Sequence, residues 1–82
     1  MFKLYEYSPS GNCYKVRLLL TQLNLAFDRT PINVLQKESR TPEFLVKNPN
    51  GRIPVLEIAP GKLLFESNAI IAFLRKMRYY PA

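Results

Sequence analysis

The sequence contains no histidine, no tryptophan and a single cysteine among its 82 residues. An internal disulfide is therefore excluded, and we expect no metal, because zinc sites use histidine or several cysteines. A lone thiol is typical of a reducing compartment, so we expect a cytoplasmic protein. No apolar run approaches the roughly 20 residues that span a bilayer, and the first residues lack the apolar stretch of a signal peptide. We therefore expect no membrane partner.

Acidic residues are also few: the chain has 6 acidic against 12 basic residues, a net charge of +6. Such a charge fits nucleic acid as well as small anionic ligands. The basic residues are scattered, however, and only Arg75, Lys76 and Arg78 cluster, where they complement the end of an expected helix. We therefore favour a small anion over nucleic acid, whose binding would depend steeply on salt.

The length allows one small domain, and the first half predicts a β-α-β unit. Alternation over residues 2–7 indicates a strand, and apolar residues at 16, 19, 20 and 23 predict a helix from about 12 to 24. Asn12 is the expected N-cap of that helix. Residues 26–34 predict a second strand, which Pro31 restricts to an edge or a bulge.

The second half predicts one short helix, a hairpin and a final helix. Thr41 and Pro42 indicate a helix start, and the turn residues at 48–51 end that helix. Residues 53–58 and 63–65 predict antiparallel strands. Ser67 is the expected cap of a helix ending near Arg78. The order βαβ-α-ββα predicts an α/β fold: a mixed four-stranded sheet, a right-handed crossover and helices on both faces.

This order and several motifs resemble the N-terminal, thioredoxin-like domain of cytosolic glutathione S-transferases, of the serine type and bacterial-like. The resemblance covers essentially the whole chain and implies a glutathione-binding domain of a detoxifying transferase, which conjugates the glutathione thiolate to a hydrophobic electrophile. The motifs that carry it are Ser10-Gly11-Asn12-Cys13-Tyr14-Lys15-Val16-Arg17, Arg40-Thr41-Pro42-Glu43-Phe44-Leu45, Asn48-Pro49-Asn50-Gly51-Arg52-Ile53-Pro54-Val55-Leu56 and Glu66-Ser67-Asn68-Ala69-Ile70.

Members of this family continue into an all-helical domain that supplies most of the electrophile pocket, and we do not expect these 82 residues to include it. We expect residues 1–78 to form the glutathione-binding domain and residues 79–82 to begin a linker, so that the chain is a fragment, a truncated product or a free-standing module. Exposed apolar side chains on the first and last helices should then promote a homodimer or aggregation. We also expect little conjugating activity from these residues alone.

The stretch S-G-N-C stands where thioredoxin-like proteins carry C-x-x-C. The resemblance implies that Ser10 donates a hydrogen bond to the thiolate of bound glutathione, with Asn12 as a second candidate donor. Without the resemblance, Ser10 is an ordinary turn residue. Cys13 begins the apolar stripe of the helix, so we expect a small buried side chain rather than a catalytic thiol.

The remaining candidates are implied to hold the rest of glutathione. A cis Pro54 would leave the backbone of Ile53 free to pair with the cysteinyl unit, although a proline at that point can also simply begin a strand. Ser67 at a helix N-terminus would take the γ-glutamyl carboxylate and Glu66 its ammonium group; otherwise Ser67 is a plain cap.

Two arginines are candidates for the glycyl carboxylate of glutathione. Arg40 and Arg52 both lie within the matching motifs, and the alternative for these two arginines is a solvated surface charge. Lys37 is a weaker candidate. The alternative function is a non-enzymatic adaptor of the same fold, which would tolerate Ser10→Ala and still hold its partner.

Overall fold

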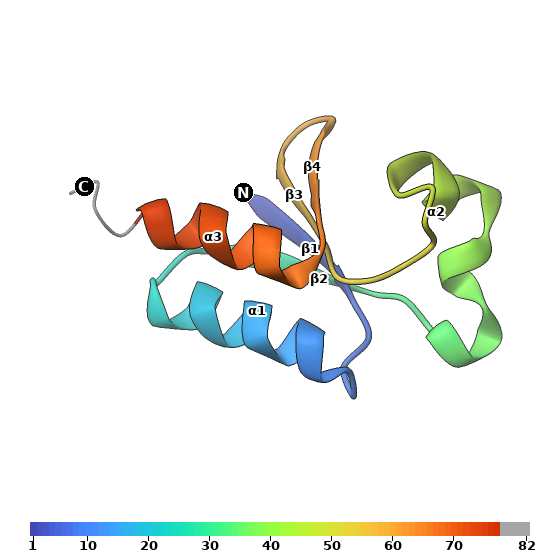
Figure 1. Ribbon diagram of the computed structural model, residues 1–82, viewed down its shortest axis with the longest axis horizontal. Helices are drawn as coiled ribbons and strands as arrows, with labels where there is room; N and C mark the ends of the chain where they lie inside the picture. Colours follow the sequence, from blue (N-terminus) through green and yellow to red (C-terminus); the bar gives the residue numbers. More distant parts are fainter. Residues whose placement is uncertain (78–82) are drawn as a thin grey trace.

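A computed structural model describes residues 1–77, which form one sheet and its helices (Figure 1). The elements follow the predicted order, with two short 3₁₀ helices inserted before α2. Their bounds are β1 (Phe2–Glu6), α1 (Gly11–Gln22), β2 (Phe27–Pro31), η1 (Val34–Gln36), η2 (Glu38–Arg40), α2 (Pro42–Lys47), β3 (Val55–Ala59), β4 (Lys62–Phe65) and α3 (Ser67–Met77).

The sheet is mixed and has the strand order β2-β1-β3-β4. β1 pairs with β2 in parallel and with β3 in antiparallel orientation, and β3 and β4 form the expected hairpin. β2 lies at an edge of the sheet, as Pro31 predicted. A proline has no amide hydrogen, and at an edge there is no second neighbouring strand that would need one. These findings confirm the thioredoxin-like architecture predicted from the sequence.

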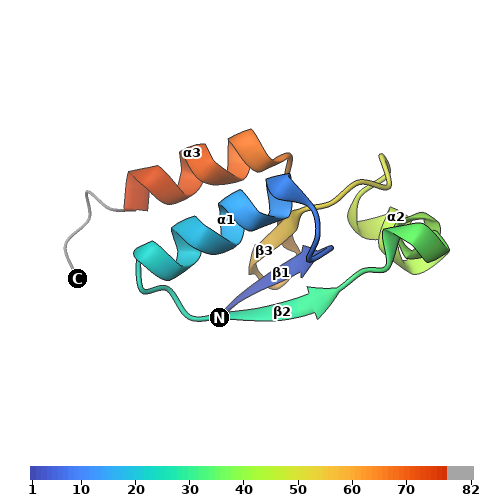
Figure 2. The same ribbon diagram turned by 90° about the horizontal axis from the view of Figure 1, so that it is seen from below.

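Side chains alternate along each strand, so the sheet presents one apolar set to α1 and α3 on one face and a second set, on the other face, that meets the short α2. Leu4 of β1 and Leu56 of β3 are fully buried beneath α1 and α3, which lie side by side (Figure 2). Their neighbours Tyr5 and Val55 belong to a second cluster with Phe44 of α2, whose ring meets that of Tyr5 edge-on at 6.2 Å. Each buried leucine contributes about 1.5–3 kcal/mol to folding.

Two predicted helix caps were wrong by one or two positions. α1 is capped by Ser10, whose hydroxyl accepts the Cys13 amide at 3.3 Å, and not by Asn12, which lies inside the helix. At α3, Ser67 is the first helical residue, and the carbonyl of Glu66 accepts the Ile70 amide at 3.0 Å. Serine and asparagine cap helices equally well, so the sequence pattern alone did not distinguish Ser10 from Asn12 as the cap of α1.

The second strand is also shorter than predicted. β2 ends at Pro31 rather than continuing to Val34, because the Asn33 side chain accepts the Gln36 amide at 3.2 Å and begins η1. The start of α2 is confirmed: the Thr41 hydroxyl accepts the Phe44 amide at 3.3 Å, and Pro42 follows directly.

The end of the last helix near Arg78 and the linker at 79–82 lie outside the described residues. Among residues 1–77, no helix has the length and apolar character needed to cross a membrane.

Candidate functional site

A polar cleft of about 260 Å³ opens where the start of α1, the loop before β3 and the β4–α3 turn meet. Six residues predicted to act at the site line it, although they are spread over more than half of the sequence. The lining comprises Asn12, Lys15, Asn48, Asn50, Arg52, Ile53, Pro54, Phe65, Glu66, Ser67 and Asn68.

Two helix N-termini point to this end of the molecule. α1 and α3 run in the same direction, and both begin beside the cleft (Figures 1 and 2). The first amides of a helix have no partner within the helix, and the helix dipole is positive there. With Lys15 and Arg52 among the lining residues, the cleft is suited to a ligand that carries negative charge.

Glu66 adopts an unusual backbone conformation at the edge of this cleft. Its φ of 69° lies in the left-handed region, which costs a non-glycine residue about 1–2 kcal/mol. Glycine would adopt this conformation without strain. Because the Glu66 side chain is exposed, its packing does not explain why a glutamate stands here instead. Strained residues of this kind collect at ligand-binding positions.

The loop before β3 is closed by hydrogen bonds from one buried side chain. The amide group of Asn48 donates to the Arg52 carbonyl at 2.9 Å, and its oxygen accepts the Asn50 amide at 3.2 Å. The Ile53–Pro54 peptide bond is cis, as the sequence context predicted. Ile53 precedes the paired residues of β3, so its peptide groups are not used in the strand ladder.

The two candidate thiol donors occupy different positions. Asn12 lines the cleft, whereas Ser10 is not among its lining residues. The Ser10 hydroxyl accepts the Cys13 amide, but a hydroxyl can donate and accept at once, so its hydrogen remains available to a ligand. Cys13 is fully buried and its sulfur accepts the Tyr7 amide at 3.4 Å, which confirms the predicted buried side chain.

The two arginines predicted to bind the glycyl carboxylate also lie in different places relative to the cleft. Arg52 lines the cleft, but Arg40 does not, and neither does Lys37. A Cβ atom added at Gly51 would lie 2.9 Å from the Arg40 side chain, so Arg40 packs against the loop behind the cleft.

Sequence reasoning did not find several polar lining residues. Lys15 follows Asn12 by three positions and therefore shares its helix face, a signal that was present in the sequence. Asn48 and Asn50 are typical turn residues, and Asn68 is typical of a helix start. Only the tertiary fold brings these three asparagines together.

A shallower groove runs between α1 and α3 beside the cleft. It is lined by Lys15, Leu18, Leu19, Gln22, Ile71 and Arg75. Tyr14 and Leu18 are 53% and 42% exposed, which confirms the expected exposure on the first helix. Within the described part of α3, no large apolar side chain is exposed to this degree.

Comparisons with known proteins find a matching family and similar chains. A family model described as "Glutathione S-transferase, N-terminal domain" matches residues 1–76. A maleylacetoacetate isomerase from Pseudomonas aeruginosa is 39% identical over 82 residues, which cover 98% of this chain and 39% of that protein.

Two solved structures share the fold. A possible glutathione S-transferase from Rhodopseudomonas palustris is 51% identical with a TM-score of 0.86, over 90% of this chain and 33% of that one. Glutathione S-transferase I bound with lactoylglutathione is 33% identical with a TM-score of 0.83, over 93% and 36% of the two chains. The chain thus spans between a third and two fifths of the length of these relatives.

Proposed function

The chain belongs to the family of glutathione S-transferase N-terminal domains, and from that membership we propose that its cleft binds glutathione for attack on an electrophile. The observation that carries the proposal is the convergence of Asn12, Ile53, Glu66 and Ser67 on one polar cleft beside two helix N-termini. Glutathione offers matching chemistry, because it has a carboxylate at each end, an ammonium group and a peptide backbone between them.

In this proposal, the γ-glutamyl end binds at the start of α3. The hydroxyl and amide of Ser67 take its carboxylate, which the helix N-terminus attracts. Glu66 takes the neighbouring ammonium group, which accounts for a carboxylate held at a strained backbone position. The Ile53 peptide groups pair with the cysteinyl unit, and Arg52 takes the glycyl carboxylate, with Arg40 as a second cation behind the loop.

The thiol then lies toward the start of α1. A hydrogen bond from Ser10 or Asn12, together with the helix N-terminus, lowers the pKa of the glutathione thiol and raises the fraction of reactive thiolate. The nucleophile therefore belongs to glutathione, and the protein supplies binding and electrostatic stabilisation.

The direct test of this proposal is an NMR titration of the chain with glutathione. We expect weak binding, of the order of 1 mM, with shifts at Ile53 and Ser67. Glu66→Gln should weaken binding at least tenfold, because it removes the partner of the ammonium group. Glu43→Gln is the matched control, since Glu43 is an exposed acid outside the cleft and its loss should change nothing. Equal effects of the two variants would refute the assignment.

The thiol contact is tested by comparing glutathione with S-methylglutathione. Ser10→Gly removes the hydroxyl while glycine still serves as a helix cap, and Asn12→Ala removes the other donor. Whichever of the two side chains donates to the thiolate, its variant should raise the pKa of the bound glutathione thiol and leave S-methylglutathione binding unchanged. If neither variant shifts that pKa, thiolate stabilisation by this loop is wrong, and the non-enzymatic adaptor becomes the better reading.

A second candidate reaction is isomerisation, which the similarity to the Pseudomonas aeruginosa isomerase favours. Here the glutathione thiolate adds to the double bond of an unsaturated acid, the resulting single bond rotates, and elimination returns the thiolate and the isomerised acid. Lys15 and Arg52 give the cleft the cations that an acidic substrate requires.

Succinate, a saturated diacid that cannot react, distinguishes the two reactions. With S-methylglutathione bound, isomerisation predicts succinate-induced shifts at Asn12 and Lys15 that Lys15→Gln removes. Lys62→Gln is the control, because it removes an exposed cation outside the cleft. Absence of these shifts favours conjugation of an uncharged, hydrophobic electrophile.

The proposal extends to compartment and assembly. Glutathione is kept reduced in the cytosol, which favours a cytoplasmic location. The exposed Leu18 on α1 supports a homodimer or a domain contact on this side of the molecule.

A further inference from the structure

We propose that Arg17 is a positioning residue for the thiol end of the cleft, because it ties the loop that carries Ser10 to a buried carboxylate. The inference rests on the proposed glutathione function for its catalytic meaning. The contact itself is a property of the protein without ligand, so it can be tested separately.

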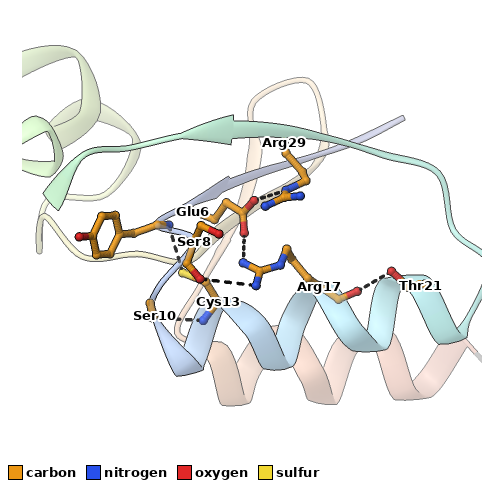
Figure 3. A network of polar contacts seen from close by, with 8 residues as sticks. Glu6, Ser8, Ser10, Cys13, Arg17, Thr21 and Arg29 are labelled. Atoms are coloured by element: carbon orange, nitrogen blue, oxygen red, sulfur yellow. Dashed lines mark hydrogen bonds and ion pairs between the residues drawn. The ribbon is translucent and has the colours of Figure 1, made fainter.

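The anchor is Glu6, the last residue of β1, whose side chain is only 3% exposed. A carboxylate buried to this degree requires charged partners, because desolvation of an unpaired charge costs several kcal/mol. It has two: Arg17 from α1, at 2.5 Å, and Arg29 from β2 (Figure 3). The carboxylate therefore joins the sheet to the helix that begins at the cleft.

Arg17 has further contacts that Arg29 lacks. Its second guanidinium nitrogen faces the Ser8 carbonyl at 3.5 Å, and the guanidinium lies 5.5 Å from the centre of the Tyr14 ring. Figure 3 shows the side chain extended between Glu6 and the loop at Ser8. The planar guanidinium can bind two acceptors at once, which a lysine ammonium cannot do in the same geometry.

The loop from residue 7 to residue 10 transmits this contact to Ser10. The Ser10 amide donates to the Tyr7 carbonyl at 2.9 Å, and the Tyr7 amide donates to the Cys13 sulfur at 3.4 Å. The Ser10 hydroxyl in turn accepts the Cys13 amide. Because these bonds link the loop to the first turn of α1, a shift at Ser8 changes where the Ser10 hydroxyl points.

Arg29 provides a matched comparison within the same ion-pair network. It binds the other oxygen of Glu6, but its side chain is 52% exposed and comes from β2, the edge strand that pairs with β1, rather than from α1. Removal of Arg29 therefore perturbs the charge on Glu6 without touching the Ser8 loop. Removal of Arg17 perturbs both.

The experiment measures amide hydrogen exchange by NMR in the unliganded chain and its variants. Arg17→Gln should speed exchange at the Ser10 and Cys13 amides at least tenfold relative to the amides of β1 and β3. Arg17→Lys should do the same while it keeps a positive charge beside Glu6, and it guards against a fold lost in the glutamine variant. Arg29→Gln should leave the ratio between loop and sheet amides unchanged.

A second readout links the loop to chemistry. In the Arg17 variants, the pKa of bound glutathione's thiol should rise toward that of free glutathione, and S-methylglutathione affinity should be retained. The same thiol pKa in Arg29→Gln and in the unaltered chain would support the inference.

The outcomes separate the inference from the proposed function. Equal exchange changes in the Arg17 and Arg29 variants, or none in either Arg17 variant, would overturn the positioning role whatever ligand binds. Failure of the unaltered chain to bind glutathione would refute the proposed function, and the exchange ratio would still decide the role of Arg17.

Discussion

The loop that shapes the cleft makes a quantitative prediction at Gly51. This residue belongs to the loop before β3 and has a φ of +63°, and an added Cβ would approach the Arg40 side chain at 2.9 Å and the Ser39 carbonyl oxygen at 3.0 Å. Gly51→Ala therefore combines a left-handed alanine with two close contacts. Arg40 can move aside because its side chain is flexible, but the Ser39 oxygen belongs to the backbone.

The magnitude follows from these two effects. A left-handed alanine costs about 1–2 kcal/mol, and crowding against backbone costs about 1–3 kcal/mol. Lower entropy of the unfolded chain offsets about 0.4–1 kcal/mol. The free energy of unfolding should thus fall by about 2–3 kcal/mol, a large part of the roughly 4–12 kcal/mol expected at 0.05–0.15 kcal/mol per residue.

The other two glycines supply matched controls for a urea-unfolding series. Gly61 has a φ of +78° but open space around it, so Gly61→Ala should cost only about 1 kcal/mol. Gly11 begins α1 with nothing within 4 Å, so Gly11→Ala should be neutral or stabilise slightly. If Gly51→Ala costs no more than Gly61→Ala, the crowding argument is wrong.

Three further predictions concern other positions. Glu66→Gly should raise the free energy of unfolding by up to about 1 kcal/mol, because it relieves the left-handed glutamate, yet weaken glutathione binding; destabilisation would contradict the strain argument. Thr41→Ala should cost about 1 kcal/mol of unfolding free energy through loss of the cap on Phe44, which thermal unfolding by circular dichroism would measure. Cys13 should react slowly with a thiol reagent in the folded chain and faster as urea is added; a rate independent of urea would show that the thiol is accessible.

Much of the fold could be predicted because local patterns decided it. Alternation at Leu4 and Tyr5 placed one side chain on each face of the sheet, and Pro31 restricted its strand to an edge. Thr41 and Pro42 fixed the start of α2, because both residues suit their positions by independent mechanisms.

What the sequence did not resolve depended on choices between equivalent residues or on distant contacts. Ser10 and Asn12 can both cap a helix, and only the path of the chain selects the first. The pairing of Glu6 with Arg17 and Arg29 joins residues 11 and 23 positions apart, a relation that no periodic pattern encodes.

The candidate site shows the same division. Ile53, Glu66 and Ser67 were predicted to act together because their motifs resemble a known domain, and the structure brings all three to one cleft. Asn68 was not predicted, because its membership of the cleft depends on how α1 and α3 lie side by side, whereas Lys15 could have been found from its spacing to Asn12 on one helix face.

The central claim is that this cleft binds glutathione, and an NMR titration of the ¹⁵N-labelled chain tests it most directly. The account predicts amide shifts that cluster at Asn12, Ile53 and Ser67 and saturate in the millimolar range, with binding weakened at least tenfold in Glu66→Gln but unchanged in Glu43→Gln. Shifts that are absent well above that range, or that spread over the α2 side instead, would contradict it.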